Sequence, residues 1–230
     1  MSQRVMIFYD LENFKMSLGH INRKMKQYRK YDYGKVQYLV IELLRKFLHI
    51  KELTPSSLIR AYAYTGEYTK EIVHRIEQEI KEMECNGEPP QNIEERRKLY
   101  SKTKERFEAQ KRFIKSIANY HFFELRTYPL KYRNGQIFQK GVDVQLAVDL
   151  VTHAFRDNFD IAVICSGDID LLESLKIVKS LGKRVVVMSH PKQTARAIRK
   201  EADFYIDIGK LNEEDLNKII FVEKEESQHE

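Results

Sequence analysis

Short runs of consecutive apolar residues alternate along the chain with stretches in which apolar residues recur every three or four positions. The consecutive runs predict strands that are buried on both faces, as in a parallel sheet. They occupy residues 5–9, 57–65, 121–128, 159–165, 184–188 and 204–208. The periodic stretches predict helices with one apolar face. They occupy residues 36–47, 72–83, 142–155, 166–181 and 193–200.

Strands that alternate with helices pair in parallel through right-handed crossovers. The pattern therefore predicts a three-layered α/β domain over residues 1–210, with helices on both faces of a central, mostly parallel sheet. In such a sheet, ligands bind beyond the carboxyl ends of the strands, near the point where the strand order reverses. Residues that follow strands are consequently the candidates for chemistry.

Residues 67–119 interrupt this alternation. The sequence CNGEPPQN breaks the helical pattern with glycine and two prolines, and a long polar helical stretch follows over residues 93–119. We expect an antiparallel helical hairpin inserted in the domain. Its many cations are typical of a solvated surface and also compatible with a nucleic-acid contact or a dimer arm in a homo-oligomer. Farther along, Asn134 and Gly135 predict a two-residue β-hairpin turn.

Charge adds a candidate binding segment. The formal net charge of +6 and an isoelectric point near 9.1 permit a polyanionic partner. The tail at residues 211–230 is acidic, whereas residues 20–35 are rich in cations: Arg23, Lys24, Lys26, Arg29, Lys30 and Lys35. Tyrosines alternate with these cations, so the segment has charges that hold phosphates and rings that stack on single-stranded bases. The alternative is a solvated loop.

The two cysteines, Cys85 and Cys165, have neither metal-ligand spacing nor the pattern of a disulfide framework, which is typical of a reducing compartment. The sequence has neither a signal-peptide pattern nor an apolar run of the roughly 20 residues that span a bilayer. We expect a cytoplasmic protein with no membrane partner.

Four aspartates follow predicted strands. Asp10 ends the first strand, Asp143 lies in the first turn of the helix after the third strand, and Asp168 and Asp170 follow the fourth. Parallel strands place all four at one rim of the sheet. Carboxylates packed there repel one another and raise each other's pKa unless a cation lies between them. Mg²⁺ or Mn²⁺ is the expected cofactor, because hard cations prefer oxygen ligands.

Each aspartate also has a structural explanation. Asp10 and Asp168 could cap helix N-termini, and an acid in a first turn, such as Asp143 or Asp170, favours the helix dipole. The position of all four on one rim favours a metal site that activates water and neutralises a phosphodiester. Asp149, farther along the helix of Asp143, is interpreted as a buried acid that is structural or supports the metal ligands, rather than as a ligand itself.

Three motifs resemble those of the NYN-domain family, within the PIN-like nucleases. They are IFYDLENF, QKGVDVQLAVDL and CSGDIDLLESLKIVKSLGKRVVVMS, in that order. The family positions that they match are Asp10, Asn13, Lys140, Gly141, Asp143, Ser166, Gly167, Asp168 and Asp170. One position departs from the family: a Phe is usual after the last acid, where this chain has Leu171. The change is conservative and does not touch the chemistry.

The resemblance implies a Rossmann-like sheet of order 3-2-1-4-5 and endonucleolytic cleavage of single-stranded or structured RNA that depends on Mg²⁺ or Mn²⁺. The implied catalytic set contains Asn13, which orients substrate or water, and the residues that hold or border the metal: Asp10, Asp143, Asp168 and Asp170. The expected substrate contacts are Lys140, Ser166, Arg23, Lys24, Lys26, Arg29 and Lys30.

Two competing functions differ in how well the residues fit them. The haloacid dehalogenase-like phosphatases have a second Asp two residues after the first-strand aspartate, and Thr or Val two further on. This chain has Glu12 and Phe14 at those positions, so a phosphatase is a poor fit. A non-catalytic RNA-binding or scaffold protein on the same fold is the remaining alternative. Convergence of the four acids around a metal would favour catalysis over it.

Overall fold

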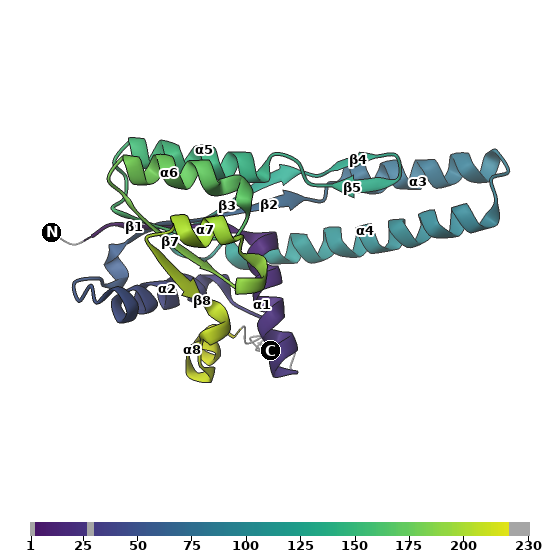
Figure 1. Cartoon of the computed structure of the whole chain (residues 1–230). Coiled ribbons are helices and arrows are strands. Elements are labelled where there is room, and N and C mark those ends of the chain that lie inside the picture. The colour runs from purple at the N-terminus through teal and green to yellow at the C-terminus, as the bar shows by residue number, and fades with distance from the viewer. Residues whose placement is uncertain (1–2, 27–29, 221–230) are drawn as a thin grey trace, which may run out of the picture.

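The computed structural model describes residues 3–26 and 30–220, and within this part six parallel strands form the central sheet in the order β3-β2-β1-β6-β7-β8 (Figure 1). They are β1 (Val5–Asp10), β2 (Leu58–Glu67), β3 (Phe123–Pro129), β6 (Ile161–Cys165), β7 (Arg184–Ser189) and β8 (Phe204–Asp207). The α/β class and the order 3-2-1-4-5 are confirmed, and β8 extends the sheet at one edge. The order reverses between β1 and β6, where a ligand crevice is expected.

Helices cover both faces of the sheet (Figure 1). Ile7 of β1 packs in the core against α1 (Leu11–Met25) and α2 (Tyr33–Leu48), and its neighbour Phe8 packs in the core on the opposite face. The helices on that opposite face are α5 (Val142–Phe155), α6 (Leu172–Ser180) and α7 (Arg196–Glu201). The continuous apolar sequence of the strands therefore supplies two cores at once.

Helix α1 was not among the predicted elements. Its buried apolar residues have helical spacing: Leu11, Phe14, Leu18 and Ile21. The solvated loop given as the alternative for the cations of residues 20–35 does not apply to Arg23 and Lys24, which lie in the last turn of α1, where cations complement the helix dipole. Helix α2 also begins earlier than expected, at Tyr33, because Asp32 caps it through a bond from the backbone amide of Lys35.

The described residues also form four short 3-10 helices: η1 (Pro55–Ser57), η2 (Ile169–Leu171), η3 (Pro191–Gln193) and η4 (Ile208–Lys210). Two of them correct predicted helices. The helix expected at residues 166–181 starts only at η2 and continues as α6, because the backbone of Asp168 is extended. The helix expected at residues 193–200 is η3 followed by α7, because Thr194 between them is extended.

Between β2 and β3 the chain forms α3 (Lys70–Cys85) and α4 (Pro90–Ile117). After β3 it forms the hairpin strands β4 (Lys131–Arg133) and β5 (Gln136–Phe138). We call these four elements the arm, and Figure 1 shows it extending away from the sheet. The arm has a small core of its own, formed by Ile72, Ile76, Ile80 and Tyr132. The helical hairpin and the β-hairpin therefore support each other.

The borders of the arm differ slightly from those predicted. Glu67 is the last residue of β2 and pairs with Pro129, so the sheet extends one residue into the predicted 67–119 segment. The turn of the β-hairpin is present as predicted. Asn134 and Gly135 both have left-handed backbone, with φ of 50° and 74°, as a two-residue hairpin turn requires.

The first part of the predicted acidic tail packs against the domain. Helix α8 (Glu213–Lys218) begins at the N-cap Asn212, and both Leu216 and Ile219 are buried in the core beneath α1 and α2. The rest of the predicted tail, residues 221–230, lies outside the described residues. Residues 213–219 are therefore part of the folded domain.

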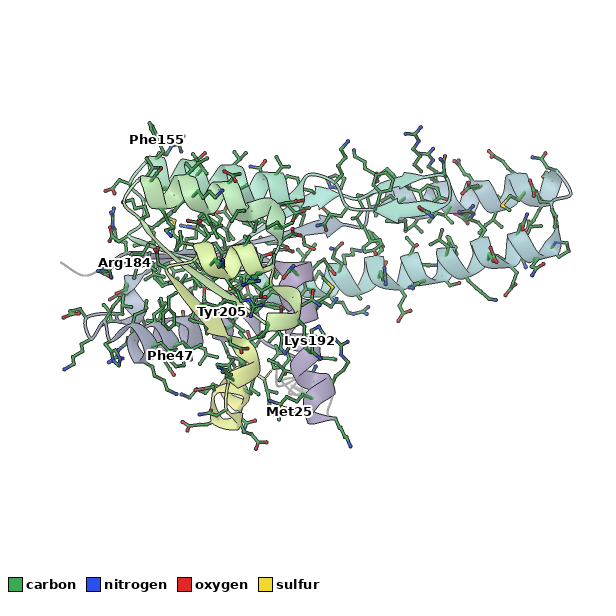
Figure 2. The ribbon with its side chains drawn as sticks, viewed as in Figure 1. Met25, Phe47, Phe155, Arg184, Lys192 and Tyr205 are labelled. Atoms are coloured by element: carbon green, nitrogen blue, oxygen red, sulfur yellow. The ribbon has the colours of Figure 1, made fainter. Side chains whose placement is uncertain are left out.

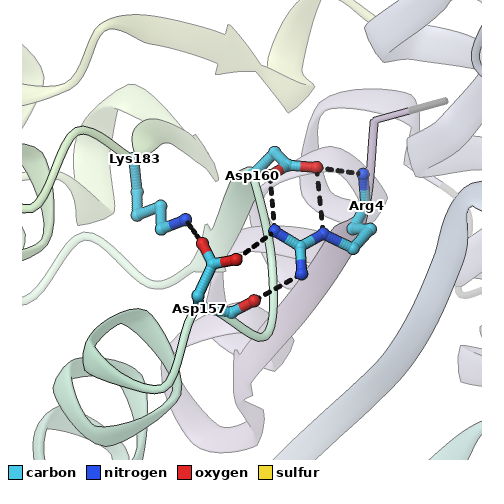
Figure 3. A network of polar contacts seen from close by, with 4 residues as sticks. All are labelled: Arg4, Asp157, Asp160 and Lys183. Atoms are coloured by element: carbon cyan, nitrogen blue, oxygen red, sulfur yellow. Dashed lines mark hydrogen bonds and ion pairs between the residues drawn. The ribbon is translucent and has the colours of Figure 1, made fainter. Parts of the chain in front are cut away.

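An ion-pair network holds the amino-terminal edge of the sheet (Figure 3). Arg4 precedes β1, and its guanidinium lies 3.0 Å from the carboxylate of Asp157 and 2.8 Å from that of Asp160, both before β6. Lys183, which precedes β7, also pairs with Asp157. The network ties three neighbouring strands together at the edge opposite to the aspartates that follow them.

Apolar side chains are also exposed on the outer face of α5. Val144, Val148 and Phe155 lie on this face at helical spacing, and Phe155 is 79% exposed at the end of the helix (Figure 2). Phe155 lies at the opposite end of α5 from Asp143. No helix in the described part of the chain combines the length and the apolar character needed to cross a membrane.

Candidate functional site

Asp10 has two roles at the carboxyl end of β1. One carboxylate oxygen accepts from the backbone amide of Asn13 at 3.1 Å, so Asp10 is the N-cap of α1. The other oxygen accepts from the Ser166 hydroxyl at 3.2 Å, across the switch point between β1 and β6. The side chain is buried. Capping, the structural alternative, therefore coexists with a position at the rim.

The motifs that follow β1 and β6 are joined by hydrogen bonds. The side-chain oxygen of Asn13 accepts from the backbone amide of Gly167 at 3.1 Å. The Ser166 hydroxyl, which donates to Asp10, also accepts from the backbone amide of Asp168 at 3.2 Å. The Asp168 carboxylate in turn accepts from the backbone amide of Asp170 at 3.0 Å. These bonds fix the backbone of both motifs relative to each other.

Gly167 lies at a position that excludes a side chain. A Cβ atom there would lie 2.2 Å from the carbonyl oxygen of Gln193 and 2.5 Å from the Cα of Thr194, which are backbone atoms. The Gly167 carbonyl oxygen also accepts from the backbone amide of Ala195 at 3.0 Å. Glycine is therefore required for the loop after β6 to pack against the loop before α7.

Asp143 reaches the same rim from α5. Gly141 is the N-cap residue of this helix and has φ of 89°, a conformation that favours glycine. Asp143 follows in the first turn and is half-buried. Burial raises the pKa of Asp143, and the negative charges of Asp168 and Asp170 raise it further. Asp143 is therefore close enough to both residues to interact with their charges.

The environment of Asp10 completes this set of interactions. Burial raises the pKa of Asp10 to about 6, the charges of Asp143 and Asp168 add to the increase, and the bonds from Asn13 and Ser166 oppose it. Three segments that are far apart in sequence therefore concentrate negative charge at the switch point. An excess of this kind favours a bound cation.

The donor set fits a hard divalent cation, because such ions prefer carboxylate and other oxygen ligands. As the side chains are placed, no three His, Cys, Asp or Glu residues among residues 3–26 and 30–220 are close enough to hold a metal ion together. The carboxyl groups therefore interact electrostatically but do not form a closed ligand shell. Binding of a cation would require the side chains to turn toward one another.

The predicted substrate contacts have different surroundings. Lys140 is exposed, and the Ser166 hydroxyl is buried between Asp10 and Asp168. Lys24 donates to the carbonyl oxygen of Gly209, and Lys26 is the C-cap of α1. Two residues, Arg23 and Lys30, line a pocket, and Arg29 lies outside the described residues. Contact of these residues with substrate stays a prediction.

Two pockets adjoin the rim. The first has a volume of about 540 Å³ and lies between α1, the end of β2, α4 and the β4–β5 hairpin. It begins at Leu11 and Glu12, directly after Asp10, and includes Gln139, directly before Lys140. The second, of about 900 Å³, continues along α1 and α4 and shares Lys15 and Phe113, among other residues, with the first.

The arm residues of these pockets were not predicted as site residues. Arg106, Gln110 and Phe113 come from α4, and Gln139 follows β5. The Gln139 side chain accepts from the backbone amide of Gly66, and Gln110 donates to the carbonyl oxygen of Gly66. The basic character of α4 was visible in the sequence, but nothing local in the sequence indicated which face of the helix meets α1.

Comparison with known proteins identifies the family. The sequence model described as "NYN domain" matches residues 4–211, nearly the whole chain. The chain belongs to the NYN-domain family. This is a PIN-like nuclease family whose members generally act on RNA and generally depend on divalent metal ions. The NYN-domain match includes the arm as well as the sheet.

Two individual proteins are similar to this NYN-domain chain. An uncharacterized protein of Methanocaldococcus jannaschii is 31% identical over 97 residues, which are 39% of this chain and 40% of that protein. This chain therefore spans well under half the length of that relative. A protein of unknown function from Vibrio parahaemolyticus has a crystal structure that matches with a TM-score of 0.54 and 16% identity, over 96% of this chain and 97% of that one. This likeness supports the fold.

Proposed function

We propose that the protein is an endoribonuclease that hydrolyses RNA phosphodiester bonds with Mg²⁺ or Mn²⁺ at the aspartate rim. The observation that carries the proposal is that Asp10, Asp143 and Asp168 come from three separate segments to the switch point. Burial there, and to a lesser degree the charges of neighbouring aspartates, raises the pKa of Asp10 to about 6 and also raises that of Asp143. Carboxylates that lie close together repel one another and destabilise the fold, unless a bound cation compensates their charge. Membership of the NYN-domain family supports the same conclusion.

Asp10, Asp143 and Asp168 are the proposed metal ligands, with Asp170 at the border. A divalent ion there would lower the pKa of bound water and neutralise charge on the phosphodiester in its transition state. Ser166 and the backbone amide of Asn13 hold the Asp10 carboxylate in position. The Asn13 side chain, which accepts from Gly167, fixes the loop that carries Asp168 and orients the substrate. Lys140, exposed at the same rim, supplies a charge that attracts phosphate.

The first prediction concerns Asp168→Asn. This substitution keeps the size of the side chain and removes one proposed ligand charge, so cleavage of RNA should fall by at least about a thousandfold. Binding of RNA in EDTA should persist, because the substitution also removes repulsion toward phosphate. The assay compares wild type and variant on single-stranded and structured RNA with Mg²⁺, Mn²⁺ or EDTA. Equal cleavage by the purified variant would contradict this site.

A non-catalytic RNA-binding function is the second candidate, and one observation favours it. The side chains as placed do not form a closed metal shell within the described residues. The same assay separates the two functions. Wild-type protein that binds RNA firmly yet leaves every substrate intact with either metal would establish the binding function and reject the nuclease.

A further inference from the structure

The two pockets form one groove between the domain and the arm. Lys15 on α1 and Phe113 on α4 line both pockets. One end of the groove borders the residues next to Asp10 and Lys140, and the other reaches Arg23 and Lys30. The arm therefore forms one wall of a groove that starts at the candidate catalytic rim. Packing of the arm's own core does not explain this position beside α1.

The charge of this groove suits a polyanion. Among the described residues that line it are five cations, against one acid, Glu12. The cations are Lys15, Arg23, Lys30, Arg106 and Arg112. Lys15 and Arg112 are exposed on facing helices, and within residues 3–26 and 30–220 neither forms an ion pair. Their charges are available to phosphates that follow the groove.

Aromatic rings accompany these charges. Phe138 of β5 is 41% exposed at the rim end of the groove, and Phe113 lines both pockets. Tyr68 lies beside Arg106, whose guanidinium is 6.0 Å from the centre of the ring. Unpaired bases stack on such rings, whereas double-stranded RNA is recognised through its phosphates and 2′-hydroxyls with its bases stacked inside.

We propose that the groove between α1 and α4 binds single-stranded RNA and delivers it to the aspartate rim. Lys15 and Arg112 hold backbone phosphates from opposite walls, and Phe138 stacks on a base beside the scissile bond. The inference rests on the proposed function, which supplies RNA as the ligand. It adds the path that the RNA strand follows across the protein and a preference for unpaired RNA. It also gives the arm a function in substrate binding.

Binding and cleavage are measured separately to test the groove. Fluorescence anisotropy in EDTA follows a labelled oligouridylate and an RNA duplex of the same length, so that binding is read without turnover. The groove variant is Lys15→Gln/Arg112→Gln. Its matched control, Lys111→Gln/Lys115→Gln, removes two exposed cations from the face of α4 that does not line the groove. Circular dichroism checks that both variants are folded.

The groove variant should bind the oligouridylate at least about tenfold more weakly. The slope of log affinity against log salt concentration should become shallower by about 1.4, because two phosphate contacts are lost at roughly 0.7 each. The control should change affinity by less than about threefold, because it removes the same charge away from the groove. Wild type should bind the single strand more tightly than the duplex. An equal loss of affinity in the groove variant and the control, or tighter binding of the duplex than of the single strand, would overturn the proposed binding groove.

Phe138→Ala tests the stacking contact independently of charge. Affinity for the oligouridylate should fall by about tenfold with an unchanged salt dependence. Phe155→Ala, at an exposed phenylalanine on α5, is the control and should bind as wild type does. Groove-dependent binding with no cleavage in Mg²⁺ or Mn²⁺ would overturn the proposed function alone. Cleavage that the groove and Phe138 variants leave unchanged would overturn the groove alone.

Discussion

At the scale of single residues, Asp10 shows how the position of a proposed metal ligand costs stability. Its carboxylate caps α1 and accepts from Ser166, yet burial and the charges of Asp143 and Asp168 raise its pKa to about 6. The hydrogen bonds therefore offset only part of the cost of holding a charge there. A residue selected for capping alone would lie in solvent, where the charged form is stable.

Asp10→Asn should stabilise the protein at pH 8 in EDTA. Asn keeps an oxygen that caps α1 but has no charge to bury. Because the folded pKa is raised, protonated Asp10 stabilises the fold at low pH, and this stability is lost as pH rises from 3.8 through about 6. The shift from 3.8 to about 6 corresponds to at most about 3 kcal/mol of unfolding free energy.

Urea unfolding at pH 8 and pH 4 measures this effect. The gain of the Asn variant should be largest at pH 8 and should disappear near pH 4, where wild-type Asp10 is protonated. Mn²⁺ should raise the melting temperature of wild type and not that of the variant. A variant that is less stable than wild type at pH 8 would show that Asp10 is a structural cap whose charge is not penalised.

At the scale of elements, the position of α5 decides where Asp143 lies. Asp149, six residues farther along α5, accepts from the Tyr64 hydroxyl at 2.9 Å and from the Gln145 side chain at 3.0 Å, and it pairs with Arg126 of β3. The predicted burial of Asp149 is thereby confirmed, and its exclusion from the metal ligands stays a prediction. Its contacts join α5 to β2 and β3 and thus hold the helix at a fixed position over the sheet.

Asp149→Asn should lower the free energy of unfolding by about 2 kcal/mol, because it leaves the partly buried Arg126 with one fewer charge partner. Cleavage should fall as well, since Asp143 is on the same helix. Glu124→Gln is the matched control: Glu124 pairs with the same Arg126 at 3.0 Å but is 40% exposed, so its removal should cost less than about 1 kcal/mol. Equal costs in urea unfolding would contradict the anchoring role.

At the scale of the whole molecule, the acids at the two ends of the parallel strands have different surroundings. At the amino-terminal edge, each acid has a cationic partner: Arg4 binds Asp157 and Asp160, and Lys183 binds Asp157. At the carboxyl ends of the strands, Asp10 and Asp143 instead experience the negative charges of neighbouring aspartates. Hydrogen bonds from Arg4 lower the pKa of Asp160, whereas burial and like charges raise that of Asp10. The amino-terminal ends of the strands therefore carry stabilising ion pairs, and the carboxyl ends carry the proposed cation site.

Asp160→Asn should therefore act in the opposite direction from Asp10→Asn. A carboxyl group whose pKa is lower in the folded state than in the unfolded chain stabilises the folded state at pH values above its unfolded pKa, about 3.9. This stability is lost as the pH falls through the lowered pKa of the folded state. The variant should lose about 1 kcal/mol at pH 7, a modest value because the side chain is 36% exposed and screened by solvent. Thermal unfolding at pH 7 and pH 3 should show the difference shrinking in acid. A constant difference would mean that the loss is one of packing.

The sequence by itself determined the sheet and the position of its acids. Continuous apolar runs identify strands because each residue of such a strand is buried on one face or the other, and parallel strands align their carboxyl ends. The placement of Asp10, Asp143 and Asp168 after strands or at a helix start was accessible in this way, whereas the order of the sheet was implied by the resemblance to the NYN-domain family. These features depend on local periodicity and on rules of chain connection.

Only the tertiary structure decided what surrounds those acids. The raised pKa of Asp10 comes from burial and from charges more than a hundred residues away in sequence, and the need for Gly167 comes from the backbone of Gln193. The groove likewise joins α1, whose helix was missed, to α4 of the arm. Local periodicity specifies which face of a helix is apolar. Packing of the whole chain decides which other segment lies against that face. The groove forms where two such segments, α1 and α4, come together.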